Sequence, residues 1–567
     1  MSGVAIDPAS SPPVALRGRV VSLDRAATVL DDGVVYARDG AIIDVRPAAA
    51  PPPAGFEAVE VTPTHGTLFP GLIELHNHLP YDVLSLWPVP RRFTNRDQWS
   101  GKSTPQYHQL ISGPMGVLGR QPEVVPAIVR YVEVRALLGG TTTSQGIALA
   151  SNAGIVSHFR GLVRNVESTG DPDLPPAATH IADIEATDAE HFLARISGTQ
   201  KLLLHLSEGV DRPAHDHFAA LHLADGRWAI TENLIGIHCA ALTAEDFRVF
   251  AGHGGSMVWS PLSNLLLYGK TADVEAARRA GVTVALGSDW SPSGSKNLLG
   301  ELKVARIYAD AVGIPLSDLE LVRMATTSPA QMLGWGARLG SLEPGKRADL
   351  IVLAGRTDDP YGQLVRATEA DMHLVMINGI TRVGTPGLMT SLVPGLQARA
   401  NVSAAGEQIR IGGRTRLLNL AQATADARVA AVTVAEAERR LEAALAAFPA
   451  GTPSTPRPLR AAVSEVGRDG EVAGSLLAVA NVVDNHMSPR PHLPLRGRLT
   501  GPNLPGNRDA ELLAMAAPLP LQALQLEPLA AVDNPGFYEA LGAADNVPAD
   551  VRQQLRQLGE AHATVIH

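Results

Sequence analysis

Cysteine is almost absent from this chain of 567 residues, in which Cys239 is the only thiol. One thiol excludes an intramolecular disulfide and a cysteine-rich metal cluster. Long apolar runs are missing as well: no stretch of about 18 apolar residues occurs, so we expect no membrane-spanning helix. The opening residues, "MSGVAIDPASSPPVALRG", have no basic stretch followed by an apolar core, which argues against a secretory signal. We therefore expect a cytoplasmic protein that does not act at a membrane.

Positive charge is in deficit. The chain has 48 Lys and Arg residues and 57 Asp and Glu residues, which gives a formal net charge of −9. This balance argues against a general nucleic-acid binder, because such a protein needs a basic surface. Hydrophobic residues make up 45% of the chain and charged residues 19%, so a sizeable core is available and disorder cannot dominate. The length exceeds one ordinary domain and suits a large catalytic domain with additions.

Residues 68–335 alternate strand-like and helix-like segments. Helical stretches such as "PAIVRYVEVRALLG" separate most of the strands, with about 30 residues per βα unit. Eight such units predict an α/β fold, a closed (β/α)₈ TIM barrel. A doubly wound sheet is the alternative, although it would not usually need eight strands with polar residues at so many strand ends. The candidate strands are "TLFPGLIELH", "GGTTTSQGIAL", "FRGLVRNVE", "THIADI", "KLLLHL", "LIGIHC", "SMVWS" and "TVALGSD".

Strand-like segments also flank this region, in residues 15–67 and 336–392. "GVVYARDGAIIDV" alternates apolar and polar positions around a hairpin turn, and "HLVMINGITRVG" repeats the pattern after the barrel. We expect the two flanks to build one composite β-sandwich domain. Residues 393–567 are predicted to be a C-terminal extension of unknown role, with an amphipathic helix at "TVAEAERRLEAALAAF".

The stretch "PGLIELHNHLPYD" contains the first candidate metal ligands. Side chains alternate along a strand, so His76 and His78 project to the same side. At the end of an inward-facing barrel strand, two neutral imidazoles suit a borderline cation such as zinc. Taken alone, the pair is as consistent with chance as with a metal site.

Further polar residues follow other apolar strands. His205 ends "KLLLH", Glu208 comes three residues later, His238 ends "LIGIH" and Asp289 follows "TVALGS". Each has an ordinary structural explanation when taken alone: a core histidine, a first-turn acid, or a buried carboxylate that needs a partner. Together they fall at the ends of strands one, five, six and eight, the face where catalytic residues converge in a barrel. This coincidence predicts a metal site.

The motifs "GLIELHNH", "LLGGTTT", "HLSEG", "GIHCAAL", "SPLSNLLLYG", "AGVTVALGSD" and "LGSLEPGKRADLIVL" make residues 15–392 resemble the amidohydrolase superfamily. The similarity is to its aminohydrolase branch of cytosine-, adenosine- and guanine-type deaminases and triazine hydrolases. The resemblance implies that His76, His78, His205 and Asp289 bind one divalent metal. It also implies that His238 polarises the attacking water or the substrate and that Glu208 shuttles protons.

The chain departs from that family pattern at two strand positions. Glu74 stands where an Asp is usual, and Trp259 stands where a His or Cys is common. The loop "WSPSGSKN" after Asp289 is also different, which leaves the substrate open. The fourth strand near "THIADI" offers no lysine for a bridging carbamate, so a single ion is expected, with zinc first and iron or manganese as alternatives.

Four protein ligands and one open position predict a catalytic site in which the ion lowers the pKa of its water to about 7. Asp289 and His238 are expected to orient the resulting hydroxide, and Glu208 to protonate a ring nitrogen or leaving group. Deamination of a nitrogen heterocycle is the first hypothesis. Hydrolysis of a cyclic amide, displacement of another ring substituent and a non-catalytic scaffold are the alternatives. The expected partner is a small molecule, and a homo-oligomer is one alternative for the assembly.

The segment after the first strand, residues 79–125, is unusually long and is predicted to lie over the barrel mouth and set substrate choice. It contains large recognition residues that could stack on a flat ring or bind its edge, namely Trp87, Arg91, Arg92, Phe93, Asn95 and Trp99. The alternative is that these residues only pack against the outer helices or a second subunit.

Overall fold

The computed structural model describes residues 11–100, 104–149, 152–159, 162–180, 188–393, 395–396, 406–422, 425–448 and 520–566. The Pro-rich stretches between residues 449 and 519 and the end of "THIADI" lie outside the described residues. No helix in the described part of the chain has both the length and the apolar character needed to cross a membrane.

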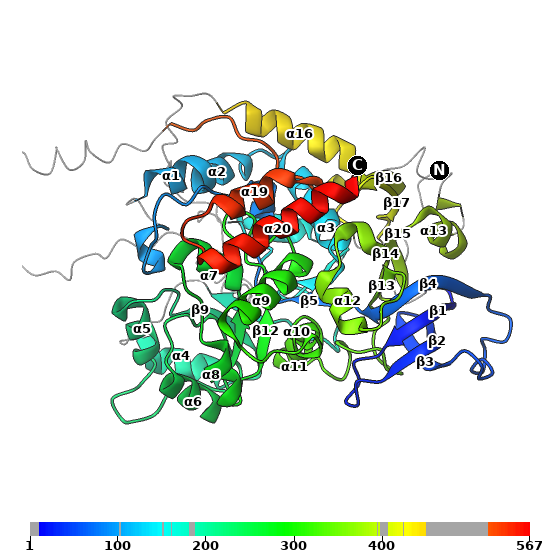
Figure 1. Ribbon diagram of the computed structural model, residues 1–567, viewed down its shortest axis with the longest axis horizontal. Helices are drawn as coiled ribbons and strands as arrows, with labels where there is room; N and C mark the ends of the chain where they lie inside the picture. Colours follow the sequence, from blue (N-terminus) through cyan, green and yellow to red (C-terminus); the bar gives the residue numbers. More distant parts are fainter. Residues whose placement is uncertain are drawn as a thin grey trace, which may run out of the picture.

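Among the described residues, eight short parallel strands form the centre of the molecule (Figure 1). They pair in two groups, β5-β6-β7 and β12-β11-β10-β9-β8. Every ladder within the groups is parallel. Each of the eight candidate strands overlaps one of them, so this part of the prediction is confirmed. Their bounds are β5 (Leu72–Glu74), β6 (Thr141–Ser144), β7 (Arg164–Asn165), β8 (Ala178–His180), β9 (Leu202–Leu206), β10 (Leu234–His238), β11 (Ser256–Trp259) and β12 (Val284–Leu286).

Single backbone contacts connect the two groups of strands. Asn77, after β5, forms a parallel bridge with Asp289, after β12. On the other side, the backbone N–H of Ala177 donates to the carbonyl oxygen of Val166 at 3.0 Å. The predicted parallel α/β architecture is confirmed by the ladders. A closed ring of ladders stays a prediction, because one contact is an isolated bridge and the other is a hydrogen bond outside any ladder.

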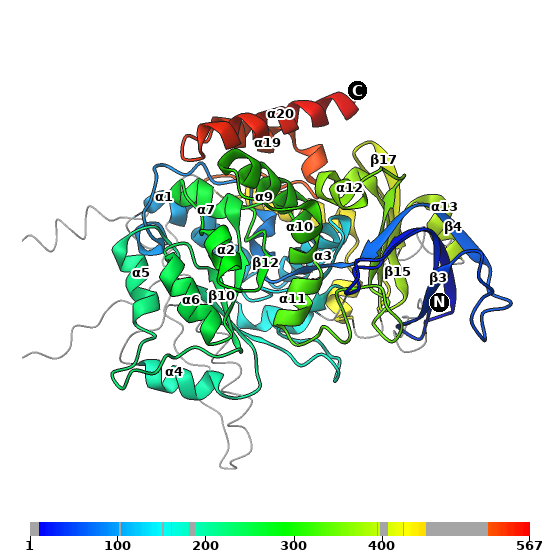
Figure 2. The ribbon, with the colours of Figure 1, turned by 60° about the horizontal axis from the view of Figure 1, so that its bottom comes forward.

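Helices surround the strands; Figure 2 shows α6, α10 and α11 outside β10 and β12. Helix α6 begins at a capping box: Thr243 and Asp246 each accept the other's backbone N–H, which satisfies two free donors at the helix start. The bounds are α3 (Val125–Leu138), α4 (Ala189–Ile196), α5 (Arg212–Ala219), α6 (Ala244–Gly252), α7 (Pro261–Tyr268), α8 (Val274–Arg279), α9 (Leu298–Val312), α10 (Asp318–Met324) and α11 (Thr327–Met332).

The long connection after β5 packs against segments that follow other central strands. The backbone N–H of Phe93 donates to Leu267 O in α7 at 2.9 Å, and that of Arg96 donates to Glu208 O after β9 at 3.1 Å. These contacts hold the connection beside the carboxyl ends of the strands. Its short helices are η2 (Leu79–Val83), η3 (Arg96–Gln98), α1 (Pro105–Tyr107), η4 (His108–Ser112) and α2 (Gly113–Leu118), and η5 (Ala153–His158) follows β6.

Strands from both flanks join one nine-stranded sheet, in the order β16-β17-β15-β14-β13-β4-β1-β2-β3. The flanks meet where β4 pairs antiparallel with β13. The sheet extends past residue 392 into β16 and β17, and a sandwich stays a prediction. The bounds are β1 (Val14–Val21), β2 (Val29–Arg38), β3 (Ala41–Pro47), β4 (Val61–Pro70), β13 (Leu350–Ala354), β14 (Met372–Ile377), β15 (Ile380–Gly384), β16 (Gly406–Ile411) and β17 (Arg414–Asn419).

The last described segment lies on the central domain. Helices α19 and α20, red in Figure 1, cross α7 and α9 and share an apolar cluster with them that includes Leu262, Val304 and Leu541. The remaining elements are α12 (Pro360–Arg366), η7 (Glu369–Asp371), α13 (Pro386–Leu392), α15 (Ala427–Ala430), α16 (Val434–Ala446), η8 (Ala531–Asp533), α19 (Pro535–Ala543) and α20 (Ala549–Ile566).

Candidate metal centre and catalytic site

The predicted site residues lie at the carboxyl ends of β5, β9, β10 and β12, and all are buried: His76 and His78, His205 and Glu208, His238, and Asp289, respectively. The backbone here is unusual. Ser207, His238 and Asp289 have φ angles of 52°, 67° and 64°, a region that residues other than glycine rarely occupy. Strain of this kind costs about 1–3 kcal/mol per residue and is concentrated at functional sites.

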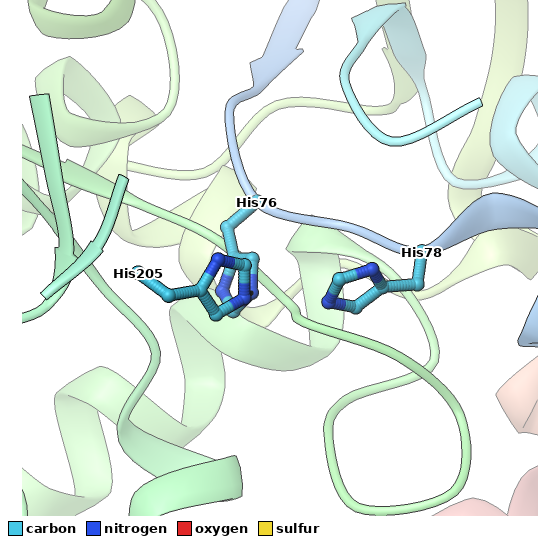
Figure 3. A group of neighbouring side chains, drawn as sticks. All are labelled: His76, His78 and His205. Atoms are coloured by element: carbon cyan, nitrogen blue, oxygen red, sulfur yellow. Dashed lines mark hydrogen bonds between the residues drawn. The ribbon is translucent and has the colours of Figure 1, made fainter. Parts of the chain in front are cut away.

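Three of the imidazoles point toward one another (Figure 3). The Nε2 atoms of His76 and His205 are 3.2 Å apart. Oδ1 of Asp289 lies 3.3 Å from Nε2 of His76 and 3.6 Å from Nε2 of His78. The ligand atoms of His76, His78 and His205 all lie within 4.8 Å of one another, as do those of His76, His238 and Asp289. The structure thus brings the four predicted ligands into one small space.

The chemistry of these atoms suits a bound cation. Burial lowers the pKa of all three histidines, to about 3 for His78, so the rings are neutral and their lone pairs are available. Burial raises the pKa of Asp289 well above its usual range, and a cation would offset the cost of its charge. Ser260 Oγ lies 2.7 Å from Nδ1 of His76, which leaves Nε2 to face the centre. Three nitrogens and one carboxylate therefore fit a divalent ion.

A chain of hydrogen bonds determines the tautomer of His238. The indole Nε1–H of Trp259 donates to Thr271 Oγ1 at 2.8 Å, and that hydroxyl donates to Asn264 Oδ1 at 3.1 Å. Because Oδ1 is the acceptor, Nδ2 of Asn264 donates to Nδ1 of His238 at 3.0 Å. Burial lowers the pKa of His238 to about 3. A neutral ring that accepts at Nδ1 carries its proton on Nε2, so His238 presents an N–H donor to the site.

A second chain orients Glu208. Trp99 Nε1–H donates to the hydroxyl of Tyr268 at 2.8 Å, and that hydroxyl donates to Oε1 of Glu208 at 2.7 Å. Indole nitrogen is a donor only, so the direction of both bonds is determined. Oε2 of Glu208 is left facing His238 Nε2 at 3.7 Å and Arg96 Nη1 at 3.9 Å. His238 and Glu208 are therefore each held in place by a tryptophan through one or more intermediate side chains.

Burial raises the pKa of Glu208, and Arg96 and the Tyr268 hydroxyl lower it in part. A carboxyl group with a raised pKa is suited to exchange protons near neutral pH. This is the property that the predicted proton shuttle requires.

The site opens into a narrow cavity, in which the space open to the centre of a water molecule is about 20 Å³. Its lining combines candidate ligands with residues from the connection after β5 and the loop after β12: His78, Arg96, Trp99, Ser100, His205, Glu208, His238, Asp289 and Trp290. Arg96 was missed by the sequence analysis, although it lies in the predicted specificity segment. Asn264 and Tyr268 were also missed. Their positions four residues apart on one helix after β11 are the signal that could have found them.

The residues expected to contact substrate divide into two groups. Trp99 lines the cavity, whereas Trp87 is buried behind it, with ring centroids 6.3 Å apart. Arg91 and Arg92 are exposed, and neither lines the cavity. The specificity role of the segment stays a prediction, now centred on Trp99 and Arg96.

The two departures from the family pattern have clear structural roles. Glu74 accepts hydrogen bonds from the backbone N–H and the hydroxyl of Ser288 at 2.7 and 2.8 Å, which ties β5 to the strand that leads to Asp289. Burial raises the pKa of Glu74 to about 7. Trp259 anchors the chain of hydrogen bonds to His238.

Comparisons with known proteins agree with the geometry. The sequence profile of the Amidohydrolase family matches residues 176–381. The 5-methylthioadenosine/S-adenosylhomocysteine deaminase of Symbiobacterium thermophilum is 25% identical over 376 residues, which cover 59% of this chain and 84% of the relative. The same-named enzyme of Moorella thermoacetica is 26% identical over 397 residues, which cover 62% and 90%.

Two solved structures resemble the fold. One is an adenosine deaminase from Xanthomonas campestris with bound zinc, with a TM-score of 0.52 and 23% identity over 65% of this chain and 92% of that one. The other is a variant of atrazine chlorohydrolase from Arthrobacter aurescens complexed with zinc and atraton, with a TM-score of 0.53 and 21% identity over 67% and 100%. At these identities the likeness shows the fold alone, an α/β fold of the TIM-barrel type.

Proposed function

Because this chain belongs to the amidohydrolase superfamily, we propose that it is a metal-dependent deaminase that hydrolyses a carbon–nitrogen bond of an aminated nitrogen heterocycle. The observation that carries this proposal is the shared space of four ligand atoms beside His238 and Glu208. The class predicted from the sequence, a hydrolase acting on carbon–nitrogen bonds, is confirmed by the relatives. The complete ligand set also argues against a scaffold without activity.

We propose zinc as the ion, held by His76, His78, His205 and Asp289. Three imidazoles and one carboxylate suit this borderline cation. When bound, zinc supplies a Lewis acid that makes a water molecule nucleophilic near neutral pH. Ser263 Oγ donates to Oδ2 of Asp289 at 2.6 Å and so leaves Oδ1 for the ion.

The reaction consumes one water and releases one ammonia. The water oxygen forms a bond to the ring carbon, the bond from that carbon to the amino group breaks, and the two water protons end on the ring nitrogen and the amine. Oε2 of Glu208 is placed to protonate the ring nitrogen, then to take a proton from the attacking oxygen and pass it to the amine. Nε2–H of His238 donates to the oxygen and orients it.

The test combines metal analysis with a screen. Protein purified without added metal is analysed for bound ions, then loaded with zinc and offered aminated and lactam heterocycles while ammonia and ring absorbance are followed. Ammonia release with an intact ring supports deamination, whereas ring opening without ammonia supports cyclic amide hydrolysis. Glu208→Gln keeps the shape of the side chain but removes its titrating proton, so turnover falls by roughly 10²–10⁴ while the metal stays. Loss of the metal in this variant would instead make Glu208 a ligand or a structural support.

We also propose that residues 68–335 close into a (β/α)₈ barrel, that residues 15–67 and 336–392 form a composite β-sandwich domain, and that residues 393–567 are an extension. The bridge between Asn77 and Asp289 supports closure on one side. The proposed partner is a small heterocycle, and the proposed location is the cytoplasm.

A further inference from the structure

Arg96 is fixed next to Glu208 by the backbone rather than by its own side chain alone. Its N–H donates to Glu208 O at 3.1 Å, and the preceding residue, Asn95, forms an antiparallel bridge with Gly209. Asn95 Nδ2 and Thr94 Oγ1 both donate to one carboxylate oxygen of Asp211, at 2.7 and 2.6 Å. The connection after β5 is thus joined to the loop after β9, and the position of Arg96 relative to Glu208 is built into the fold.

The guanidinium group of Arg96 lies inside the cavity. Its side chain is 14% exposed, and Nη1 is 3.9 Å from Oε2 of Glu208. It is also close enough to the centre for its positive charge to lower the pKa of His78, His205 and His238. An always-charged planar donor therefore stands beside the proton-transferring oxygen.

The donors and acceptors around the reacting centre determine which hydrogen-bonding groups a substrate ring needs. His238 and Arg96 present N–H groups, and Oε2 of Glu208 is the oxygen that can protonate a ring nitrogen. Oε2 of Glu208 and Nη1 of Arg96 are near enough to hydrogen-bond to neighbouring atoms of one planar ligand. A ring nitrogen flanked by a carbonyl carbon matches this pair, because the nitrogen takes the proton from Glu208 and the carbonyl oxygen accepts from Arg96.

The walls restrict the size and shape of the ligand. Trp99 and Trp290 line the cavity with their ring centroids 6.1 Å apart. The space open to the centre of a water molecule is only about 20 Å³, so the cavity is narrow. Flat aromatic walls and this volume favour a heterocyclic base without a large substituent.

We propose that Arg96 is a specificity-determining residue and that it selects compact aminated heterocycles in which the ring nitrogen next to the reacting carbon is flanked by a carbonyl group. The inference rests on the proposed deaminase function. It predicts that rings with this edge are preferred over matched rings that have a C–H in place of the carbonyl.

The experiment uses zinc-loaded protein and pairs of substrates that differ only in that carbonyl: 4-aminopyrimidin-2-one against 4-aminopyrimidine, and 6-aminopurin-2-one against 6-aminopurine. We expect kcat/KM to favour the carbonyl member by about 10- to 150-fold, the range for a hydrogen bond to a charged group. Arg96→Met is expected to abolish the preference, and Arg96→Lys to keep part of it. Arg91→Met is the matched control, because Arg91 lies in the same segment but is exposed and outside the cavity.

Binding separates this inference from the proposed function. Calorimetry with the unreactive rings pyrimidin-2-one and pyrimidine should show the same Arg96-dependent preference. A binding preference without turnover of any aminated ring would overturn the deaminase function and leave the selection by Arg96 supported. Equal binding and turnover of both members by the wild-type protein would overturn the inference, as would an unchanged preference in Arg96→Met. If Arg96→Met does not fold, the comparison of Arg96→Lys with Arg96→Gln decides in the same way.

Discussion

The hydroxyl of Tyr268 donates to Oε1 of Glu208 at 2.7 Å, and this contact determines which carboxylate oxygen faces His238 and Arg96. The hydroxyl has a single proton. Because it accepts a hydrogen bond from Trp99, it donates that proton to Glu208. The carboxylate is therefore presented to the cavity through Oε2 alone.

Tyr268→Phe should leave metal content unchanged and lower kcat by about 10-fold, because Glu208 loses the bond that orients it. The Tyr268 hydroxyl lowers the pKa of Glu208, so its removal should move the limb of the pH–rate profile that belongs to Glu208 to higher pH. The measurement is kcat/KM against pH. A reduced rate with an unmoved profile would mean that Tyr268 only supports packing.

Asn264→Asp should reverse the tautomer of His238. A carboxylate at this position accepts a hydrogen bond from Nδ1–H, which leaves Nε2 as an acceptor toward the site. A wrong tautomer at a catalytic histidine costs up to about 10⁴ in kcat, and we expect a loss of about 10²–10⁴ here. Nitrogen NMR of labelled histidine checks the tautomer directly. A tautomer change with activity within about threefold of wild type would show that the donor at Nε2 is not used.

Metal content should be about one equivalent per chain, because the candidate ligand atoms in the described residues form one cluster. A chelator should lower the melting temperature, since an ion that binds only the folded state stabilises it. Asp289→Ala should lose both the ion and this response to chelator. Two equivalents of similar affinity in elemental analysis would reveal a second set of ligands.

The buried ion pair between Lys296 and Glu527, 2.5 Å long, joins the loop after Asp289 to the C-terminal segment. Both side chains are almost fully buried, at 2% and 1% exposed. Lys296→Met removes the charged partner of the buried Glu527 carboxylate and leaves only a neutral donor, Asn534 Nδ2 at 2.7 Å, so it should cost about 3–5 kcal/mol of stability. The double variant Lys296→Met/Glu527→Leu should recover much of this loss.

Chemical denaturation of the zinc-loaded protein measures these differences. The matched control is Arg212→Met, which breaks the exposed pair with Asp216 and should change stability by no more than about 1 kcal/mol. If Lys296→Met and the double variant were equally unstable, the loss of stability would come from packing and not from the unpaired charge of Glu527.

Glu301 should make stability fall as pH rises. Burial raises its pKa from 4.5 to about 8, so between these values the folded state holds a proton that the unfolded state has released. The contribution is therefore complete below about pH 4.5 and is lost by about pH 8, at about 1.4 kcal/mol per pH unit. Glu301→Gln reproduces the protonated form and should remove this slope.

Unfolding of wild type and Glu301→Gln at pH 5, 6, 7 and 8 provides the measurement. Glu245→Gln serves as the control, because Glu245 is 72% exposed. Parallel pH dependences in wild type and Glu301→Gln would show that the carboxyl is ionised throughout this range.

The candidate ligands could be picked out from the sequence because the signal is local. An apolar run that ends in a histidine or aspartate indicates a strand end, and parallel strands bring their carboxyl ends to one face. His76, His205, His238 and Asp289 each carry that signal within a few residues. The eight strands and the cap at Thr243 were predictable for the same reason.

The groups that orient the candidate catalytic residues were decided by the tertiary structure. Tyr268 is 60 residues from Glu208 in the sequence. Lys296 pairs with Glu527, which belongs to the C-terminal segment. Arg96 had no pattern to distinguish it from the exposed Arg91 and Arg92 until the bridge between Asn95 and Gly209 placed it in the cavity. Such contacts depend on how separate elements pack, and no local periodicity encodes the distance between two side chains that are far apart in the chain.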